Sequence, residues 1–322
     1  MCLGPSMPSD SVLVTGSGGY IGGQVGLELQ DHGYAVIGVD RRDRPISRYW
    51  KNIQAGFTSS ETLTWITRNQ PSTIVHCAGT SLVGPSMTDP GEYYRNNVAR
   101  TIKLLEHVRQ YSPHTRVIFA SSAATYGEPD PALVPLQESA PTTPISPYGH
   151  SKLIVEQILA DYHAAYGLGY VAFRFFNVCG ADPQKRHGQE NGATHIVARV
   201  CESLRDNAVF RLNGNDYNTP DGTCIRDYVH VSDIASAIRF AITRKDMNGV
   251  FNIGSAHGHS NQEIMQAAER ITGQKLDWQV GPRRLGDPDR LTASPEKLNA
   301  LNWKSSFDLD DMIRHAWQWY VR

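Results

Sequence analysis

The chain of 322 residues lacks several features that would each point to a particular class of protein. No apolar run approaches the roughly 18 residues of a membrane-spanning helix, so we expect no membrane partner. Basic and acidic residues nearly balance, at 31 and 32, and no dense basic stretch occurs, which argues against nucleic acid as a partner. The start of the chain has no basic segment followed by an apolar one, so we expect no secretory signal.

Cysteine is also scarce. The chain has five cysteines, an odd number, and none of them forms a Cys-x-x-Cys pair. The 12 histidines are scattered rather than grouped with cysteines or acids. We therefore expect no metal site, no disulfide framework and a cytoplasmic location, where thiols stay reduced.

What the sequence does contain is an alternation of apolar segments with segments of helical period. The expected strands are 11–15, 34–40, 73–77, 116–120 and 169–174, and the expected helices are 20–32, 60–69, 89–111 and 147–166. Strands and helices alternating at this spacing indicate a parallel sheet with helices on both faces, a Rossmann-type doubly wound α/β fold.

The pattern loosens beyond residue 180. Residues 182–191 and 213–222 are rich in Gly, Asn, Asp and Pro, which is typical of long loops. Further elements are expected at 231–243, 249–253, 261–272 and 309–320. We predict a first domain over 11–180 and a smaller α/β domain over 181–322, with part of 223–255 returning to the first.

A glycine-rich turn joins the first expected strand to the first helix. Its spacing, Gly16-x-x-Gly19-x-x-Gly22, followed by a helix that starts with Tyr20 and Ile21, suits a backbone that approaches a pyrophosphate. Asp40 ends the second strand, where a carboxylate accepts hydrogen bonds from the adenosine ribose. This predicts a dinucleotide and favours NAD over NADP, although the arginines at positions 41 and 42 could accommodate a 2′-phosphate.

Tyr148 and Lys152 lie one turn apart if residues 147–166 form a helix. A cation beside a phenol favours the phenolate, and a hydroxyl from Ser122 could share the substrate oxygen with it. The same spacing also occurs on solvated helix faces, so the pair gains meaning only beside the glycine turn.

Together these motifs resemble the extended short-chain dehydrogenase/reductase family. Local segments are most similar to its UDP-glucose (UDP-galactose) 4-epimerases: 92–98, 119–127, 174–177, 214–217, 221–231 and 282–287. The resemblance covers residues 11 to 320. It implies that the first domain binds NAD and the second binds a UDP-sugar.

The resemblance also implies residue roles. The catalytic residues would be Ser122, Tyr148 and Lys152, with Tyr148 as base on the sugar 4-hydroxyl and Lys152 lowering its pKa. Contacts to NAD would come from Gly16, Gly19, Tyr20, Ile21, Gly22, Asp40, Ala78, Asn97, Ser121, Tyr148, Lys152 and Phe176. Contacts to the UDP-sugar would come from Ser122, Tyr148, Asn177, Thr194, His195, Ile196, Arg226, Arg284, Asp287 and Leu291.

Some positions depart from related enzymes. Dehydratases and decarboxylases of this fold carry carboxyls where this chain has Ala123 and Ala124, so the chemistry should stop at oxidation and re-reduction. The family's adenine-binding Asp is replaced in the stretch 55–58, which reads Ala-Gly-Phe-Thr. Leu291 stands where some members carry a Tyr that excludes bulky 2-N-acetyl sugars.

The sequence thus predicts an isomerase that epimerises C4 of UDP-galactose and UDP-glucose with NAD. UDP-N-acetylhexosamines and UDP-glucuronate remain as alternative substrates. A non-catalytic dinucleotide sensor is the alternative of another class. By analogy with the family, the helices over 89–111 and 147–166 would form a homodimer.

Overall fold

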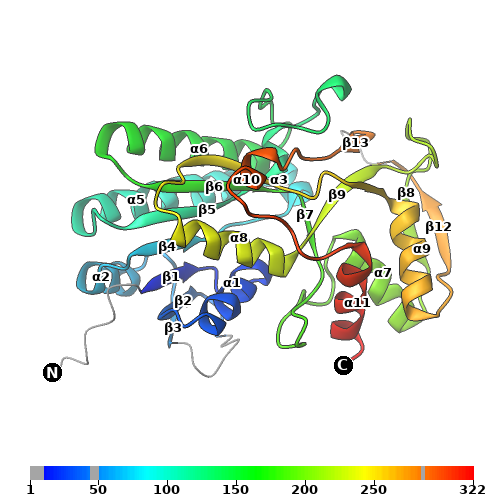
Figure 1. Cartoon of the computed structure of the whole chain (residues 1–322), viewed down its shortest axis with the longest axis horizontal. Coiled ribbons are helices and arrows are strands. Elements are labelled where there is room, and N and C mark those ends of the chain that lie inside the picture. Colours follow the sequence, from blue (N-terminus) through cyan, green and yellow to red (C-terminus); the bar gives the residue numbers. More distant parts are fainter. Residues whose placement is uncertain (1–10, 44–50, 284–286) are drawn as a thin grey trace. The chain divides into compact units, whose positions relative to one another are not determined.

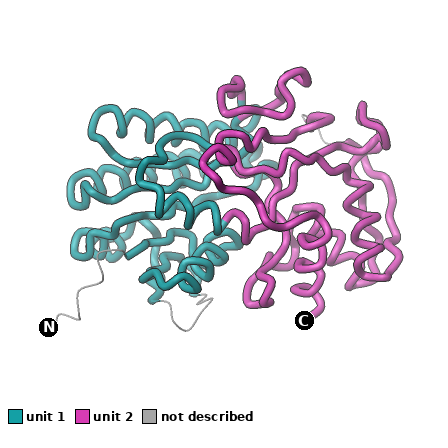
Figure 2. Tube along the Cα trace, in the orientation of Figure 1, with its two compact units in different colours: residues 1–125, 144–174, 235–251 teal, residues 126–143, 175–234, 252–322 magenta. Residues whose placement is uncertain are grey.

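The computed structural model describes residues 11–43, 51–283 and 287–322. The chain divides into two compact units, and each is built from three segments (Figure 2). Unit 1 comprises Met1–Thr125, Pro144–Arg174 and Ala235–Phe251. Unit 2 comprises Tyr126–Thr143, Phe175–Ile234 and Asn252–Arg322. The chain therefore passes between the two units after residues 125, 143, 174, 234 and 251.

Unit 1 is built around a seven-stranded sheet with the strand order β10-β6-β5-β4-β1-β2-β3 (Figure 1). Its strands are β1 Val12–Thr15, β2 Val36–Asp40, β3 Lys51–Gln54, β4 Thr73–His76, β5 Arg116–Ser122, β6 Tyr170–Phe175 and β10 Gly249–Ile253. The neighbours from β3 to β5 pair in parallel. The order reverses between β1 and β4, and ligands of such sheets bind where the strands end at this reversal.

The helices of unit 1 bury the sheet, as a parallel sheet requires. They are α1 Tyr20–Asp31, α2 Ser60–Asn69, α3 Val83–Thr88, α4 Pro90–Tyr93, the π-helical η1 Tyr94–Ala99, α5 Arg100–Tyr111, the short 3₁₀ turn η2 Ala123–Thr125, α6 Pro147–Tyr166 and most of α8 Val231–Thr243. Leucine, isoleucine and valine side chains of α2, α5 and α6 share one core cluster with the sheet. This fold class is the one that the sequence predicts.

The long helix α6 shows how local sequence sets its bounds. Ser146 precedes it and its side chain accepts a hydrogen bond from the Gly149 N–H at 3.1 Å. Pro147 occupies the first helical position, where its missing N–H costs nothing. Gly167 ends the helix with a φ of 72°, a conformation that favours glycine.

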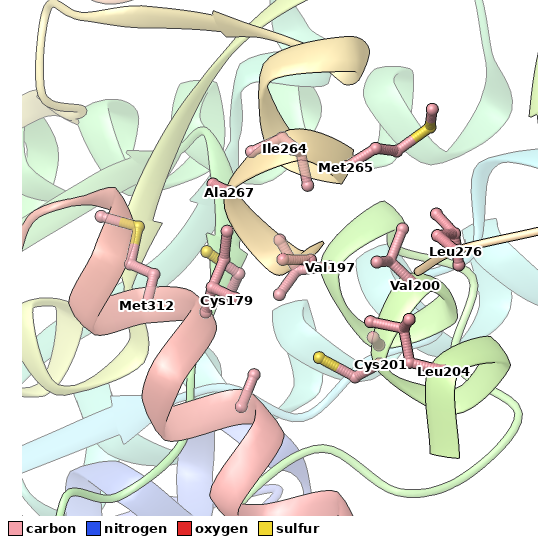
Figure 3. Packing of buried hydrophobic residues seen from close by; sticks show 14 of the residues in the cluster. Cys179, Val197, Val200, Cys201, Leu204, Ile264, Met265, Ala267, Leu276 and Met312 are labelled. Carbon is pink, nitrogen blue, oxygen red and sulfur yellow. The ribbon is translucent and has the colours of Figure 1, made fainter. Parts of the chain in front are cut away.

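Unit 2 combines short strands with three amphipathic helices. Its elements are η3 Pro131–Leu133, β7 Asn177–Cys179, α7 Ile196–Asp206, β8 Phe210–Asn213, β9 Ile225–His230, β11 Gly258–Ser260, α9 Asn261–Thr272, β12 Trp278–Gly281, β13 Arg290–Leu291, α10 Glu296–Asn299 and α11 Leu309–Tyr320. Figure 3 shows apolar side chains of α7, α9 and α11, such as Val200, Ile264 and Met312, packed into one cluster. No helix in the described ranges is long and apolar enough to cross a membrane.

Candidate active site

The glycine turn lies between β1 and α1, at the reversal of strand order. Gly16 has a φ of 72°, and a Cβ on it would lie 2.8 Å from the Ala78 nitrogen in the loop after β4. A Cβ on Gly22 would lie 2.2 Å from the Gly16 carbonyl oxygen. Only glycine fits at either place. Gly19, the N-cap of α1, provides no side-chain cap, and the first turn of the helix holds no acid, so its N-terminal amides suit a pyrophosphate.

Asp40 binds this turn directly. Its carboxylate accepts hydrogen bonds from the Gly18 N–H at 3.0 Å and from the Arg42 N–H at 2.9 Å. The Arg42 guanidinium donates to the Gly18 carbonyl at 2.7 Å. Arg42 is thus held by the turn and by Asp40, an arrangement that places a carboxylate, not a free cation, at the end of β2. These residues fit the NAD that the sequence predicts.

Asn97 belongs to the π-helical turn η1 and links the loop after β4 to α6. Its side-chain oxygen accepts from the Thr80 N–H at 2.8 Å, and its amide donates to the Ser151 hydroxyl at 3.0 Å. Single π turns of this kind often occur at functional sites. The geometry makes Asn97 a link between the loop after β4 and α6, and its contact to the cofactor stays a prediction.

The proposed catalytic residues come together at the start of α6 and the end of β5. The Ser122 hydroxyl forms a hydrogen bond with the Tyr148 phenol. A Cβ on Gly149 would lie 2.5 Å from the Ala124 carbonyl oxygen, so glycine is needed for the first turn of α6 to approach the η2 segment this closely. Tyr93 packs edge-on against the Tyr148 ring, with centroids 6.3 Å apart.

Burial sets the charge state of these groups. It raises the pKa of Tyr148, and the hydrogen bond from Ser122 opposes that shift. The sequence predicts a lowered pKa for this phenol, and in this structure that prediction is wrong because desolvation outweighs the other effects. Burial also lowers the pKa of Lys152 to about 8. The Lys152 ammonium donates to the Ala120 carbonyl at 2.7 Å and lies 5.7 Å from the Tyr148 ring centroid.

Unit 2 carries the predicted phosphate-binding arginine. Arg226 on β9 is 8% exposed, and its guanidinium pairs with the Asp287 carboxylate at 2.5 Å. The Tyr217 hydroxyl donates to the same carboxylate at 3.0 Å. Leu291 on β13 lies opposite Arg226 in the strand register. Arg226, Asp287 and Leu291 are thus brought together, as the resemblance implies.

The remaining predicted residues have simpler surroundings. Asn177 on β7 lies opposite Tyr228 of β9 in the register. Phe176 is buried with its ring centroid 6.3 Å from that of Tyr126. Thr194, His195 and Ile196 lead into α7, with His195 at its N-cap. The predicted Arg284 lies outside the described residues.

Several residues at these sites escape prediction from the sequence. The Ser121 hydroxyl donates to Glu156, which also pairs with Arg174 at 2.7 Å. Tyr217 stands in a segment quoted for the resemblance, but its bond to Asp287 has no sequence signature. Glu156 could have been found from the sequence, because it follows Lys152 by the same four-residue step that separates Lys152 from Tyr148.

Comparisons with known proteins agree with this geometry. A UDP-glucose 4-epimerase of Halalkalibacterium halodurans is 38% identical over 321 residues, covering 96% of this chain and 95% of that protein. The structure of a UDP-glucose 4-epimerase from Brucella ovis in complex with NAD is 38% identical, with a TM-score of 0.91 over 97% of this chain and 98% of that chain.

A second solved structure is a UDP-glucose 4-epimerase from Bifidobacterium longum in complex with NAD⁺ and UDP. It is 33% identical, with a TM-score of 0.90 over 97% of this chain and 98% of that one. The model of the NAD dependent epimerase/dehydratase family matches residues 12–254. These matches confirm NAD as the cofactor, and the chain belongs to the NAD dependent epimerase/dehydratase family.

Proposed function

We propose that this protein is an NAD-dependent isomerase that inverts C4 of a UDP-hexose and interconverts UDP-galactose and UDP-glucose. The observation that carries the proposal is the meeting of the Tyr148 phenol with the Ser122 hydroxyl, one turn before the buried Lys152 ammonium. With NAD to accept and return the hydride, a phenol, a hydroxyl and a cation suffice for the proton transfers in oxidation and re-reduction of an alcohol. Elimination would need a further carboxyl, and the positions after Ser122 are Ala123 and Ala124.

The residues of unit 1 hold the cofactor and move one proton. The pyrophosphate would bind at Gly16, Gly22 and the N-terminal amides of α1. The hydroxyls of the adenosine ribose would donate hydrogen bonds to Asp40. Bound NAD would supply the hydride acceptor and donor for C4 of the sugar. Tyr148 takes the proton of the 4-hydroxyl and gives it back, while Ser122 donates a hydrogen bond to the same oxygen.

Each direction of proton transfer makes a different demand on Tyr148. The raised pKa caused by burial suits the phenol as an acid, which must return a proton to the re-reduced sugar. The same shift opposes its use as a base. The hydrogen bond from Ser122 and the positive charge of Lys152 act against that penalty, because each stabilises the phenolate.

Unit 2 supplies the nucleotide contacts in this proposal. Arg226 would bind the diphosphate, for which its planar guanidinium is well suited, and Asp287 would accept from the nucleoside ribose. Their ion pair holds both side chains in place before the nucleotide arrives. Asn177, Thr194, His195, Ile196 and Arg284 complete the predicted nucleotide contacts.

The test is epimerisation without added NAD. Purified protein should interconvert UDP-galactose and UDP-glucose, measured by chromatography of the two nucleotides. Tyr148→Phe should lose at least about a hundredfold in kcat, since acid–base catalysis contributes 10² to 10⁴. Tyr166→Phe, on the same helix but 56% exposed, is the matched control and should keep wild-type turnover. A Tyr148→Phe enzyme of near-normal kcat would refute the mechanism.

The substrate range depends on Leu291 and leaves a second candidate activity. A leucine beside Arg226 leaves more room than a tyrosine, so UDP-N-acetylgalactosamine and UDP-glucuronate belong in the same assay. Leu291→Tyr should remove turnover of the N-acetyl sugar and keep that of UDP-galactose. Bound NAD with no turnover of any of these nucleotides would favour a dinucleotide sensor instead.

We further propose a homodimer in the cytoplasm. Tyr94 of η1 and Ile102 of α5 are large apolar side chains that are 39% and 38% exposed, within the helices that the family resemblance assigns to pairing. Ile102→Asp should convert a dimer to a monomer in sedimentation velocity. The described cysteines are all free thiols, which suits a reducing compartment, and cell fractionation tests that location.

A further inference from the structure

Helix α6 carries a third buried or partly buried polar side chain, that of Glu156, in line with Tyr148 and Lys152. Tyr148, Lys152 and Glu156 follow one another at four-residue steps, so they lie along the same side of the helix. Lys152 is 6% exposed and Glu156 is 4% exposed. Two charges this deep in a protein need partners, because an unpaired buried charge costs several kcal/mol.

Glu156 finds its partners on two neighbouring strands. Arg174 of β6 binds its carboxylate in a two-pronged manner, with Nη2 to Oε2 at 2.7 Å and Nε to Oε1 at 3.1 Å. The Ser121 hydroxyl of β5 donates to Oε1 as well. One carboxylate therefore joins α6 to β5 and β6, with geometry that is strong and directional.

The three side chains of α6 meet three consecutive residues of β5. Lys152 donates to the Ala120 carbonyl, Ser121 donates to Glu156, and Ser122 bonds to Tyr148. The Glu156 contact lies in the middle of this row on β5. A shift of Glu156 would displace both the strand end that carries Ser122 and the helix turn that carries Lys152.

We propose that Glu156, held by Arg174 and Ser121, is a positioning residue for the epimerase reaction. It fixes Lys152 and Ser122 around the Tyr148 phenol and keeps the Lys152 ammonium charged. This inference rests on the proposed function, because it takes its meaning from the roles given there to those three residues.

The charges around Lys152 support the second part. Burial lowers the pKa of Lys152 to about 8, while Cys77, which directly follows β4, and Glu156 on α6 both raise it. His76 of β4 also faces this charge, but its own pKa falls to about 3, so it stays neutral. Loss of the Glu156 carboxylate would therefore lower the pKa of Lys152 further, toward neutral pH. Part of the Lys152 side chains would then be uncharged at the pH at which the enzyme is assayed.

The experiment compares Glu156→Gln with the double variant Glu156→Gln, Arg174→Gln. The single variant leaves the Arg174 cation buried without its partner and should lower Tm strongly. The double variant removes both charges and should recover Tm. If Glu156 acts as proposed, Lys152 loses its proton at a lower pH in both variants. The fall of kcat/KM at high pH should then begin on the order of one pH unit earlier than in the wild type. A double variant with recovered Tm and a fall of kcat/KM at the wild-type pH would overturn the proposal.

Two further variants keep every outcome informative. Glu156→Asp retains the charge but shortens the side chain. The fall of kcat/KM at high pH should therefore begin at the wild-type pH, while kcat falls about tenfold at unchanged KM. Wild-type kcat in this variant would refute the positioning role even if the double variant does not fold. Tyr148→Phe separates the hypotheses: activity there defeats the proposed function, whereas an inactive Tyr148→Phe beside a wild-type-like double variant defeats only the role of Glu156.

Discussion

Replacement of Lys152 by methionine should abolish epimerisation without destabilising the fold. Burial lowers the pKa of Lys152 from its ordinary 10.5 to about 8, and each pH unit corresponds to 1.36 kcal/mol. Keeping the ammonium buried therefore costs the fold about 3 kcal/mol at neutral pH. The bond from Lys152 to the Ala120 carbonyl returns about 1.5–3 kcal/mol. Lys152→Met should thus be as stable as the wild type or up to about 1.5 kcal/mol more stable.

The pH dependence gives a sharper version of this test. Between about pH 8 and 10.5 the unfolded wild type still binds the lysine proton that the folded protein has released, so wild-type stability rises with pH over that range. The gain is about 3 kcal/mol, and Lys152→Met lacks it. Urea denaturation of nucleotide-free protein, followed by fluorescence of the six tryptophans, measures the free energy of unfolding against pH for the wild type and for Lys152→Met. Parallel slopes, or a Lys152→Met protein weaker by more than 2 kcal/mol at pH 7, would refute the reasoning.

Three other changes have defined outcomes. Gly22→Ala places a Cβ 2.2 Å from the Gly16 carbonyl oxygen and should abolish bound NAD, measured by absorbance after denaturation; retained NAD would contradict the turn geometry. Gly56→Asp restores the carboxylate that the family uses for adenine, and no atom of the described residues lies within 4 Å of the new Cβ, so NAD release should slow. The pKa of buried His76 is lowered to about 3, so the unfolded state gains a proton first as pH falls below about 6.5 and stability drops by up to about 5 kcal/mol near pH 3. His76→Gln should flatten that acid-induced loss in circular dichroism titrations; a slope equal to that of the wild type would argue against a neutral buried histidine.

The sequence predicts best the elements whose signals are local. The bounds of the helix over 60–69 and of the helix over 147–166 agree with α2 and α6, because the capping residues directly flank each segment and the apolar spacing lies within it. The expected helix over 89–111 is interrupted by the π turn η1, where Asn96 and Asn97 bond to Thr80. That interruption depends on a partner outside the helix, so no feature of the helix sequence announces it.

In the second unit the expected helices over 261–272 and 309–320 coincide with α9 and α11, but other elements are harder to predict. Strands β11 and β13 have three and two residues and exist because both pair with β9. Helix α7 is not among the expected elements, because the loops around it dominate the local composition, although Val197, Val200, Cys201 and Leu204 give it a clear apolar face. The predicted catalytic trio comes from the family resemblance of local motifs, whereas the link from Glu156 to Arg174 joins residues 18 positions apart on different elements.

The division of the chain also has a consequence for its synthesis. Residues up to Ser122 provide strands β1 to β5, with the glycine turn and the Ser122 hydroxyl already in place. One side of β5 stays unpaired until β6 is made, and β6 in turn pairs with β10, the edge strand, whose last residue is Ile253. A nascent chain shorter than this exposes an unpaired strand edge, a common start of aggregation. The seven-stranded sheet is therefore complete only after residue 253 has been synthesised, long after the glycine turn has been made.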